Sequence, residues 1–235
     1  MRVSSSEYLR GSMNPANVFK VAKHNSEFYK AHPDYFRPEG LLIFCGEQGS
    51  GKTLSAVQYV KKLCWDYPKA ILCTNVDIKG LPPLTRVVEY DGLDCLKSLE
   101  NGYQGVIYLI DEIHLEFNSL ESKNIDIEIM VEVSQQRKQR KHIVGTTQVY
   151  GRLAKPFREQ IRNVVLCSNI CRVLQLNRLI DGSKSREEDG KLITETSKSF
   201  FWFHTPALYD CYDTYAKMRR YRNEWQGRRI DARRN

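Results

Sequence analysis

The chain of 235 residues carries a net charge of +8, and 41% of its residues are hydrophobic while 27% are charged. These values are those of an ordinary soluble globular protein with enough sequence for one large or two small domains. No segment approaches the roughly 18 uninterrupted apolar residues that a membrane span needs, and the first residues lack the apolar core of a signal peptide. We therefore expect a cytoplasmic protein without a membrane span.

The seven cysteines are odd in number and scattered along the chain, and several lie in apolar runs such as LLIFC and VVLC. This distribution favours reduced, buried thiols over a disulfide framework.

The positive charge is concentrated near the C-terminal end. Residues 217–235 hold eight Lys and Arg against Glu224 and Asp231, a net of +6, which leaves +2 for the rest of the sequence. Such a basic segment can bind the phosphate backbone of a nucleic acid or an acidic protein surface. A solvated terminus without a partner is the simpler alternative.

The first half of the chain alternates apolar runs with segments of helical spacing. Residues 1–37 are polar and aromatic and end in prolines and a glycine that break a helix, so we interpret them as an N-terminal arm. The apolar run 41–46 predicts a buried strand, and the spacing of apolar residues from Lys52 onward predicts an amphipathic helix. Further strands are predicted at 70–76, 86–90 and 105–111, and a short helix at 94–101.

The second half continues this alternation and ends in an antiparallel pair. The segment 125–141 predicts a helix of about four turns, and the apolar run 142–148 predicts the strand after it. The remaining predictions are a short helix at 155–163, a strand at 164–169, a β-hairpin formed by 173–181 and 197–205 around the polar turn 182–192, and a helical pattern from Tyr209 onward. Strands that alternate with helices predict a parallel sheet covered by helices.

A phosphate-binding loop (Walker A) is predicted where the first strand meets the first helix. GEQGSGKT, residues 46–53, fits G-x-x-x-x-G-K-[ST] in the strand–loop–helix context that the motif requires. Glycines let backbone N–H groups approach phosphate oxygens, and the helix start adds partial positive charge. Lys52 would reach the β- and γ-phosphates, and the Thr53 hydroxyl would ligate Mg²⁺. The predicted nucleotide-binding residues are Gly46, Glu47, Gln48, Gly49, Ser50, Gly51, Lys52, Thr53 and Leu54.

An acidic pair follows the apolar strand VIYLI (Walker B). Asp111 is placed to hold the Mg²⁺ shell, and Glu112 is placed to accept a proton from the water that attacks the γ-phosphate. The pair favours hydrolysis over phosphorylation of a small molecule, because a kinase acceptor supplies its own nucleophile. A surface pair that caps the next segment is the alternative.

The next apolar strand ends in Thr146, Thr147 and Gln148. In the additional-strand group of P-loop ATPases, such a strand lies between the phosphate-loop strand and the strand of the acidic pair. We therefore expect Gln148 near the γ-phosphate as a sensor that positions water. The alternative is that this polar stretch merely begins a turn.

Arginines are candidates for a catalytic finger that acts on a neighbouring subunit. Arg137 and Arg140 are three residues apart and share one face of the predicted helix. An arginine supplied by a neighbour can stabilise the charge of a transferring phosphoryl group. Arg158 and Arg162 are further candidates, and a solvated basic face or contact with DNA phosphates is the alternative.

The order of five motifs resembles that of the zonula occludens toxin-like ATPases. The motifs are GEQGSGKT, CTNVDIKGL, VIYLIDEIH, RKQRKHIVGTTQ and ALYDCYDTY. This family includes filamentous phage assembly proteins and belongs to the HerA–FtsK superfamily together with viral DNA-packaging ATPases. The resemblance covers about residues 40–215, and the T-N-x-x-x-x-G-L stretch, Gln148 and the Tyr-Asp-Thr-Tyr ending are more discriminating than the P-loop.

The resemblance implies an α/β P-loop NTPase fold of the additional-strand type, RecA- and HerA–FtsK-like, with a mainly parallel central sheet flanked by helices. A C-terminal β-hairpin and a basic helical tail complete the expected fold. We expect an N-terminal arm at 1–37, the ATPase domain at 38–208 and the basic tail at 209–235.

The resemblance further implies a homo-oligomeric ring, a pentamer or hexamer, that hydrolyses ATP with Mg²⁺ to move double- or single-stranded DNA. It assigns phosphate and Mg²⁺ contacts to Lys52, Thr53 and Asp111, the base to Glu112 and the sensor to Gln148. Filamentous-phage members usually have a membrane helix after the ATPase domain, and this sequence has none. That difference favours a soluble motor in the host cytoplasm that docks on a capsid, portal or assembly protein and associates transiently with virions.

These expectations converge on an ATP-driven DNA translocase that packages a viral or phage genome. The segment 115–128 is a candidate pore loop, with a surface loop as the alternative. Alternative functions are an ATPase for phage assembly or extrusion, or a helicase-loader-like ATPase that binds a protein partner without moving DNA. A kinase is disfavoured by the acidic pair.

Overall fold

The structure is a computed structural model that describes residues 14–119, 127–182, 186–188, 191–193 and 196–212. The chain divides into two compact units, Met1–Tyr35 and Phe36–Asn235, and each is considered by itself. Residues 120–126 of the candidate pore loop and residues 213–235 of the basic tail lie outside the described residues. Among the helices within the described ranges, none combines the length and apolarity needed to cross a membrane.

The first unit contains a helix that the sequence interpretation missed. α2 (Ala16–Ala31) occupies much of the segment that we interpreted as an arm. At its C-terminal end the His32 ring stacks on Phe28 with centroids 4.5 Å apart, and Tyr35 meets the same ring edge-on at 5.0 Å. The aromatic residues of this segment therefore pack on one another at the end of a helix, which is worth about 0.5–1.5 kcal/mol per ring pair.

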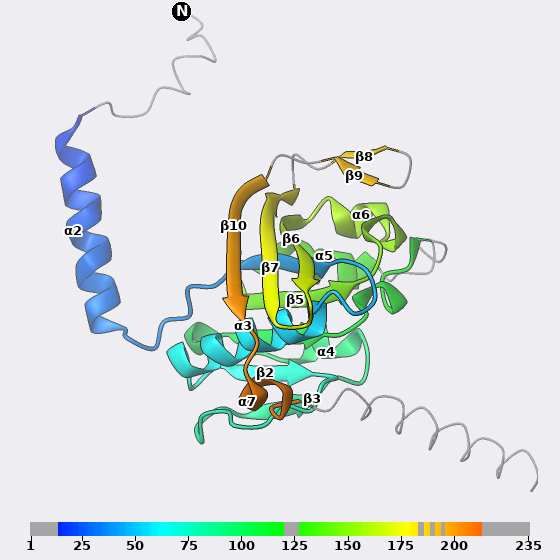
Figure 1. Cartoon of the computed structure of the whole chain (residues 1–235). Helices are drawn as coiled ribbons and strands as arrows, with labels where there is room; N and C mark the ends of the chain where they lie inside the picture. Colours follow the sequence, from blue (N-terminus) through cyan, green and yellow to red (C-terminus); the bar gives the residue numbers. More distant parts are fainter. Residues whose placement is uncertain (1–13, 120–126, 183–185, 189–190, 194–195, 213–235) are drawn as a thin grey trace, which may run out of the picture. The chain divides into compact units, whose positions relative to one another are not determined.

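The second unit is built on one eight-stranded sheet with the order β10-β7-β6-β1-β5-β4-β2-β3 (Figure 1). All neighbours from β6 to β3 run parallel, whereas β7 and β10 run antiparallel to their neighbours. The mainly parallel sheet is the one expected from the alternating pattern. The strands are β1 (Gly40–Cys45), β2 (Ile71–Thr74), β3 (Val87–Glu89), β4 (Val106–Ile110), β5 (Lys141–Thr147), β6 (Ile161–Ile170), β7 (Leu174–Asp181) and β10 (Thr196–Phe203).

Helices cover both faces of this sheet. α3 (Lys52–Asp66) and α7 (Pro206–Tyr209) pack on one face, and α4 (Asp94–Ser98), α5 (Ile127–Gln135) and α6 (Lys155–Arg158) pack on the other (Figure 1). The alternation of side chains along β1 shows the division: Leu41 and Ile43 join the α4–α5–α6 cluster, whereas Leu42 and Phe44 join the α3 cluster. A strand buried on both faces needs a continuous apolar run, and the sequences of β1 and β4 are such runs.

β5 lies between β1 and β4, as expected for the additional-strand type. Its residues pair in parallel with β1 from Gly40 to Cys45 and with β4 from Val106 to Ile110. Because parallel strands end at the same edge of a sheet, the loops after these three strands meet there. This edge holds the candidate site.

The predicted helix at 125–141 is too long. α5 ends at Gln135, and residues 136–140 form turns. Arg140 adopts a left-handed conformation with φ of 56°, which turns the chain back into β5. The following Lys141 is buried and donates hydrogen bonds to Leu96 O at 2.7 Å and Glu132 Oε2 at 3.1 Å. A buried lysine with two hydrogen-bond acceptors cannot be recognised from hydrophobic periodicity, because that pattern counts Lys as a solvent-facing residue.

The connection between β7 and β10 contains further structure. β7 and β10 pair antiparallel along most of their length. Between them, β8 (Arg186–Glu188) and β9 (Lys191–Ile193) form a separate two-stranded sheet. The polar segment 182–192 is therefore partly strand, and not a simple turn as its composition predicts.

Candidate nucleotide site

The P-loop joins the end of β1 to the start of α3. Two of its glycines, Gly46 and Gly51, lie so close to other residues that a side chain would not fit. Gly51 has φ of 82°, and a Cβ there would overlap Oε1 of Gln175. A Cβ on Gly46 would come within 2.6 Å of the Cys167 carbonyl oxygen. Glycine is the residue that tolerates both conditions, so the loop holds a shape that other residues would disrupt.

The remaining loop residues differ in exposure. Glu47, Gln48 and Gly49 are exposed at the tip of the loop, and Ser50 is half-buried with an Oγ that has no hydrogen-bond partner. Leu54 is only 3% exposed, so its side chain packs in the interior and its backbone alone remains for a ligand. A buried hydroxyl without a partner is costly, which is consistent with a ligand oxygen at this position.

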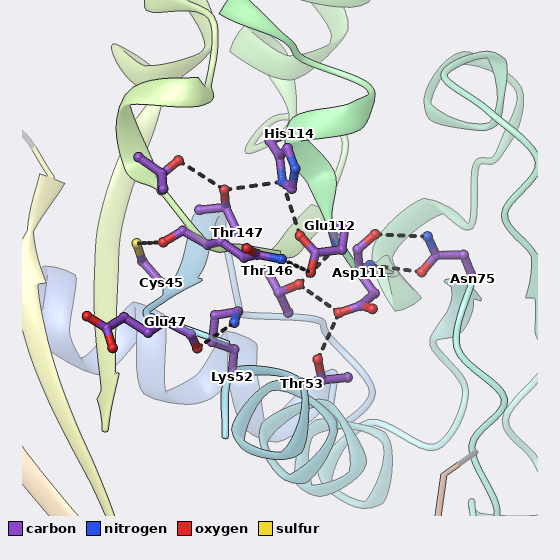
Figure 2. A network of polar contacts seen from close by, with 12 residues as sticks. Cys45, Glu47, Lys52, Thr53, Asn75, Asp111, Glu112, His114, Thr146 and Thr147 are labelled. Carbon is purple, nitrogen blue, oxygen red and sulfur yellow. Dashed lines mark hydrogen bonds and ion pairs between the residues drawn. The ribbon is translucent and has the colours of Figure 1, made fainter. Parts of the chain in front are cut away.

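Lys52 is the first residue of α3 and is 7% exposed. Its Nζ donates a hydrogen bond to the Glu47 carbonyl oxygen at 3.0 Å, so the side chain arches back across the loop (Figure 2). The positive charge is thereby held over the segment whose backbone N–H groups would face an anion. The loop and the helix start together have the positive polarisation that an anion site requires.

Asp111 connects the P-loop helix to the central strands. Its Oδ1 accepts hydrogen bonds from Thr53 Oγ1 at 2.9 Å and Thr146 Oγ1 at 2.7 Å (Figure 2). Thr53 lies on α3, Asp111 follows β4, and Thr146 lies in β5. The structure thus brings two predicted metal-ligating residues into direct contact.

Asn75 fixes the backbone of Asp111. Its Nδ2 donates to the Asp111 carbonyl oxygen at 3.1 Å, and its Oδ1 accepts from the Asp111 N–H at 2.8 Å. We did not predict a site role for Asn75, although it belongs to the T-N stretch quoted for the family resemblance. The available signal was its place directly after β2, at the same edge of the sheet as Asp111.

Glu112 has an unusual backbone for a non-glycine residue. Its φ is 54°, in the left-handed region, and its N–H donates to Thr146 Oγ1 at 2.9 Å. Such a conformation costs about 1–3 kcal/mol and persists only where surrounding contacts enforce it. Thr146 therefore supports both acidic residues, through the side chain of Asp111 and the backbone of Glu112.

Both carboxylate oxygens of Glu112 have a polar neighbour. Oε1 accepts a hydrogen bond from Gln148 Nε2 at 3.3 Å. Oε2 is buried and lies 3.2 Å from His114 Nδ1, a contact close enough for an ion pair but not aligned as a hydrogen bond (Figure 2). The predicted base and the predicted sensor are thus in contact. His114, which is only 9% exposed, is a residue that the sequence interpretation missed.

The oxygen pair formed by Thr53 and Asp111 fits a magnesium ion. Hydroxyl and carboxylate oxygens are hard ligands, and Mg²⁺ binds oxygens at about 2.0–2.1 Å in octahedral geometry, which places neighbouring ligands about 2.9 Å apart. Thr53 Oγ1 and Asp111 Oδ1 are 2.9 Å apart. These two residues would hold the ion, and nucleotide phosphates and water would supply the remaining ligands.

Arg137 and Arg162 lie at the opposite edge of the sheet. Arg137 Nε and Arg162 Nη1 contact opposite oxygens of Glu39 at 2.8 and 3.0 Å, and Glu39 precedes β1 at the end opposite to the P-loop. The prediction that Arg137 and Arg140 share a helix face is wrong, because α5 ends at Gln135.

Arg140 and Arg158 have other contacts. The Arg140 carbonyl oxygen accepts from the Val106 N–H at the start of β4, so Arg140 also lies at the edge opposite to the P-loop. The Arg158 guanidinium lies over the ring of Tyr150, which follows β5, 5.9 Å from its centroid. The chain's own fold therefore places three of the four candidate arginines at the edge opposite to the P-loop.

Residues 207–212, the first part of the motif ALYDCYDTY, pack beside the site. Ile78, in the loop after β2, forms a bridge with Tyr212, and the Lys79 N–H donates to the Cys211 carbonyl oxygen at 2.7 Å. Burial, followed by the negative charge of Asp111, raises the pKa of Tyr212 to about 12. A neutral phenol therefore lies near the acidic pair at neutral pH. The rest of this motif lies outside the described residues.

Comparison with solved structures places this chain among P-loop NTPase folds. It is similar to the N-terminal domain of the zonular occludens toxin from Neisseria meningitidis, with a TM-score of 0.53 and 17% sequence identity, over 75% of this chain and all of that domain. The genome packaging NTPase B204 of Sulfolobus turreted icosahedral virus 2 matches over 68% of this chain and 98% of its own, at 12% identity and a TM-score of 0.48.

The ATPase domain of G40P covers 78% of this chain and 94% of its own, at 9% identity and a TM-score of 0.45. No protein-family model and no curated protein sequence matches the chain. The fold expected from the motifs is therefore confirmed: the chain has a P-loop NTPase fold like that of the zonular occludens toxin domain.

Proposed function

We propose that the chain is a Mg²⁺-dependent ATPase that works in a homo-oligomeric ring to move DNA during the packaging of a viral or phage genome. The observation that carries the proposal is the placement of Glu112. Its carboxylate is held by Gln148 and His114 at the edge of the sheet where the P-loop lies, next to the Thr53–Asp111 pair.

The proposed chemistry assigns one task to each side chain. Lys52 and the loop N–H groups bind the β- and γ-phosphates, and Thr53 and Asp111 hold the Mg²⁺ that neutralises phosphate charge. Glu112 accepts a proton from the attacking water, while Gln148 positions that water. The contact between Gln148 and Glu112 supports this division, because the two groups must face the same water molecule.

The DNA part of the proposal rests on charge and on the family resemblance. The net charge of +8 is concentrated in residues 217–235, which lie outside the described structure. Basic residues hold the phosphate backbone without reading its sequence, as a translocating motor requires. Arg137, Arg140 and Arg162 would act on a nucleotide only from a neighbouring subunit, since they lie at the edge of the sheet opposite to the P-loop in the chain's own fold. Arg158 remains a further candidate for this role.

A second candidate function is an assembly or extrusion ATPase that binds a protein partner. Phe200, Phe201 and Phe203 on the edge strand β10 are 50%, 73% and 69% exposed. Exposed aromatic residues of this kind are typical of protein interfaces. This candidate predicts hydrolysis that responds to a protein and not to DNA.

Replacement of the proposed base tests the hydrolytic function. Glu112→Gln keeps the shape of the side chain but removes the carboxylate, so we expect ATP binding to persist while phosphate release falls by about 10²–10⁴-fold. The measurement is phosphate release in single-turnover conditions together with equilibrium binding of ATP. Lys52→Ala is the control that should lose binding as well. Near-normal turnover by Glu112→Gln would remove Glu112 from the role of base.

A further inference from the structure

The P-loop is held from the side by two amide side chains of the β6–β7 hairpin. Gln175 in β7 donates from Nε2 to the Ser50 carbonyl oxygen at 3.0 Å. Asn169 near the end of β6 donates from Nδ2 to the Gly49 carbonyl oxygen. Two successive carbonyl groups of the loop are therefore oriented by strands that follow the ATPase motifs in the sequence.

The orientation of the Gln175 amide is fixed by its surroundings. The side chain is fully buried, and Nε2 also donates to Asn177 Oδ1 at 3.0 Å. Its Oε1 lies 3.2 Å from His204 Nε2, just after β10. Because Nε2 faces two oxygen acceptors and Oε1 faces an imidazole nitrogen, this amide orientation satisfies every neighbour.

The consequence for the loop follows from peptide geometry. In a trans peptide the C=O and the next N–H point in opposite directions. With the Ser50 carbonyl directed at Gln175, the Gly51 N–H is directed away from β7. The Gln175 Oε1 also occupies the space that a Cβ on Gly51 would need, so the hairpin supports the loop at the residue where α3 is about to begin.

We propose that Gln175 is a positioning residue for nucleotide binding, assisted by Asn169, and that the β6–β7 hairpin is thus a working part of the nucleotide site. The proposal rests on the proposed function of the loop as an ATP site. By holding the Ser50 carbonyl turned toward β7, Gln175 keeps the Gly51 N–H available to phosphate oxygens before the nucleotide arrives, while Asn169 fixes the preceding carbonyl of the loop. A loop without this support must be ordered by the nucleotide itself, which weakens binding.

The test compares two substitutions of buried residues in the same strand. Gln175→Met keeps length and volume but loses the donor, so we expect the Kd for ATP and for ADP to rise about tenfold, which corresponds to about 1.4 kcal/mol. Turnover at saturating ATP should stay within about threefold of wild type, since Gln175 touches none of Asp111, Glu112 and Gln148. An increase in Kd without a comparable loss of turnover separates positioning from a general structural defect.

Ile180→Val is the matched control. Ile180 is also buried in β7, but its side chain packs in the core cluster under α4, α5 and α6 and makes no contact with Gln175 or the loop. This variant should lower the thermal unfolding temperature without nucleotide while its Kd changes by less than about threefold. Asn169→Ala removes a half-buried side chain and provides a second variant that folds even if Gln175→Met does not, with an expected rise in Kd of about threefold.

The outcomes distinguish the inference from the function on which it rests. A wild-type chain that binds no nucleotide would overturn the ATPase proposal itself. A wild-type chain that binds ATP, with unchanged Kd in Asn169→Ala and equal Kd in Gln175→Met and Ile180→Val, would overturn only the role of the hairpin.

Discussion

Glu112 is placed by residues at the ends of two neighbouring strands, β4 and β5. Its backbone is held by Thr146 of β5, one carboxylate oxygen by Gln148, and the other lies against His114 of the turn that follows β4. A general base works best when its geometry is set before the substrate binds, because reorganisation then adds nothing to the barrier. The left-handed backbone of Glu112 is consistent with such enforced placement.

The charge of Asp111 gives a residue-scale prediction. Asp111→Asn retains an Oδ1 that accepts from Thr53 and Thr146, so the fold should persist, but it loses the negative charge that attracts Mg²⁺. We expect the Mg²⁺ concentration for half-maximal phosphate release to rise at least about tenfold. A Mg²⁺ titration of ATPase activity measures this. Glu159→Gln, an exposed residue just after α6, is the control; identical titration curves for all three proteins would exclude Asp111 as a ligand.

A site residue can be predicted from the sequence when the residues that define its role lie near it along the chain. Lys52 and Thr53 belong to one strand–loop–helix unit, and Asp111 and Glu112 directly follow one strand, so local pattern is enough. Asn75, Thr146 and Gln175 act only because particular strands are neighbours. Their tasks depend on strand order and register, which no local pattern contains. Gln175 is hidden further, because alternating polar residues in a hairpin normally mark a solvent-facing side.

At the scale of elements, His142 joins two strands and one helix of the P-loop unit. It lies in β5, and its Nδ1 is 2.9 Å from the carbonyl oxygen of Gly40 in β1, while Nε2 is 3.0 Å from the hydroxyl of Tyr59 in α3. A carbonyl only accepts, so Nδ1 carries the proton and Nε2 of the neutral ring accepts from Tyr59. Burial lowers the pKa of His142 to about 4. The ring is therefore neutral in the folded protein at neutral pH.

This buried imidazole predicts acid sensitivity. The unfolded chain protonates His142 near pH 6.5, whereas the folded chain resists protonation until about pH 4. Between these values the unfolded state binds more protons, so the free energy of unfolding falls as the pH is lowered, by up to about 3 kcal/mol from this residue. This loss of unfolding free energy is complete below about pH 4 and absent above about pH 6.5.

Urea unfolding at several pH values checks this prediction. In His142→Asn, the amide N–H takes the place of Nδ1–H as the donor to Gly40 O, but the amide does not take up a proton. The free energy of unfolding of this variant should therefore decline less than that of wild type between pH 7 and pH 5. The difference between the two proteins isolates His142 from the carboxylates that titrate in the same range. Parallel pH curves would show that the ring titrates equally in both states.

Element boundaries are predicted well where burial is symmetrical and poorly where it is not. β1 and β4 are continuous apolar runs, and both are found within a residue or two. α5 is predicted too long because Lys141 looks like a helix surface residue yet is buried and paired inside the fold. α2 is missed because prolines and aromatic residues near its end suggest an irregular arm.

At the scale of the whole molecule, a P-loop unit with an additional-strand sheet is combined with an N-terminal helical unit and a strongly basic C-terminal sequence. The P-loop unit contains the complete set of residues proposed for hydrolysis, except an arginine from a neighbour. Assembly into a ring would supply that arginine in trans and would align the basic segments of several subunits along one polyanion. Hydrolysis, assembly and DNA binding are therefore expected to depend on one another.

The most direct test is the rate of phosphate release by the purified full chain with ATP and Mg²⁺, measured with and without duplex DNA, while the mass of the particle is determined in the same solutions. A DNA-moving ring predicts phosphate release that duplex DNA stimulates and a mass of several chains when ATP is present. Hydrolysis that ignores DNA would favour the protein-partner alternative. Absence of phosphate release under all of these conditions would contradict the central claim that this site is an ATPase.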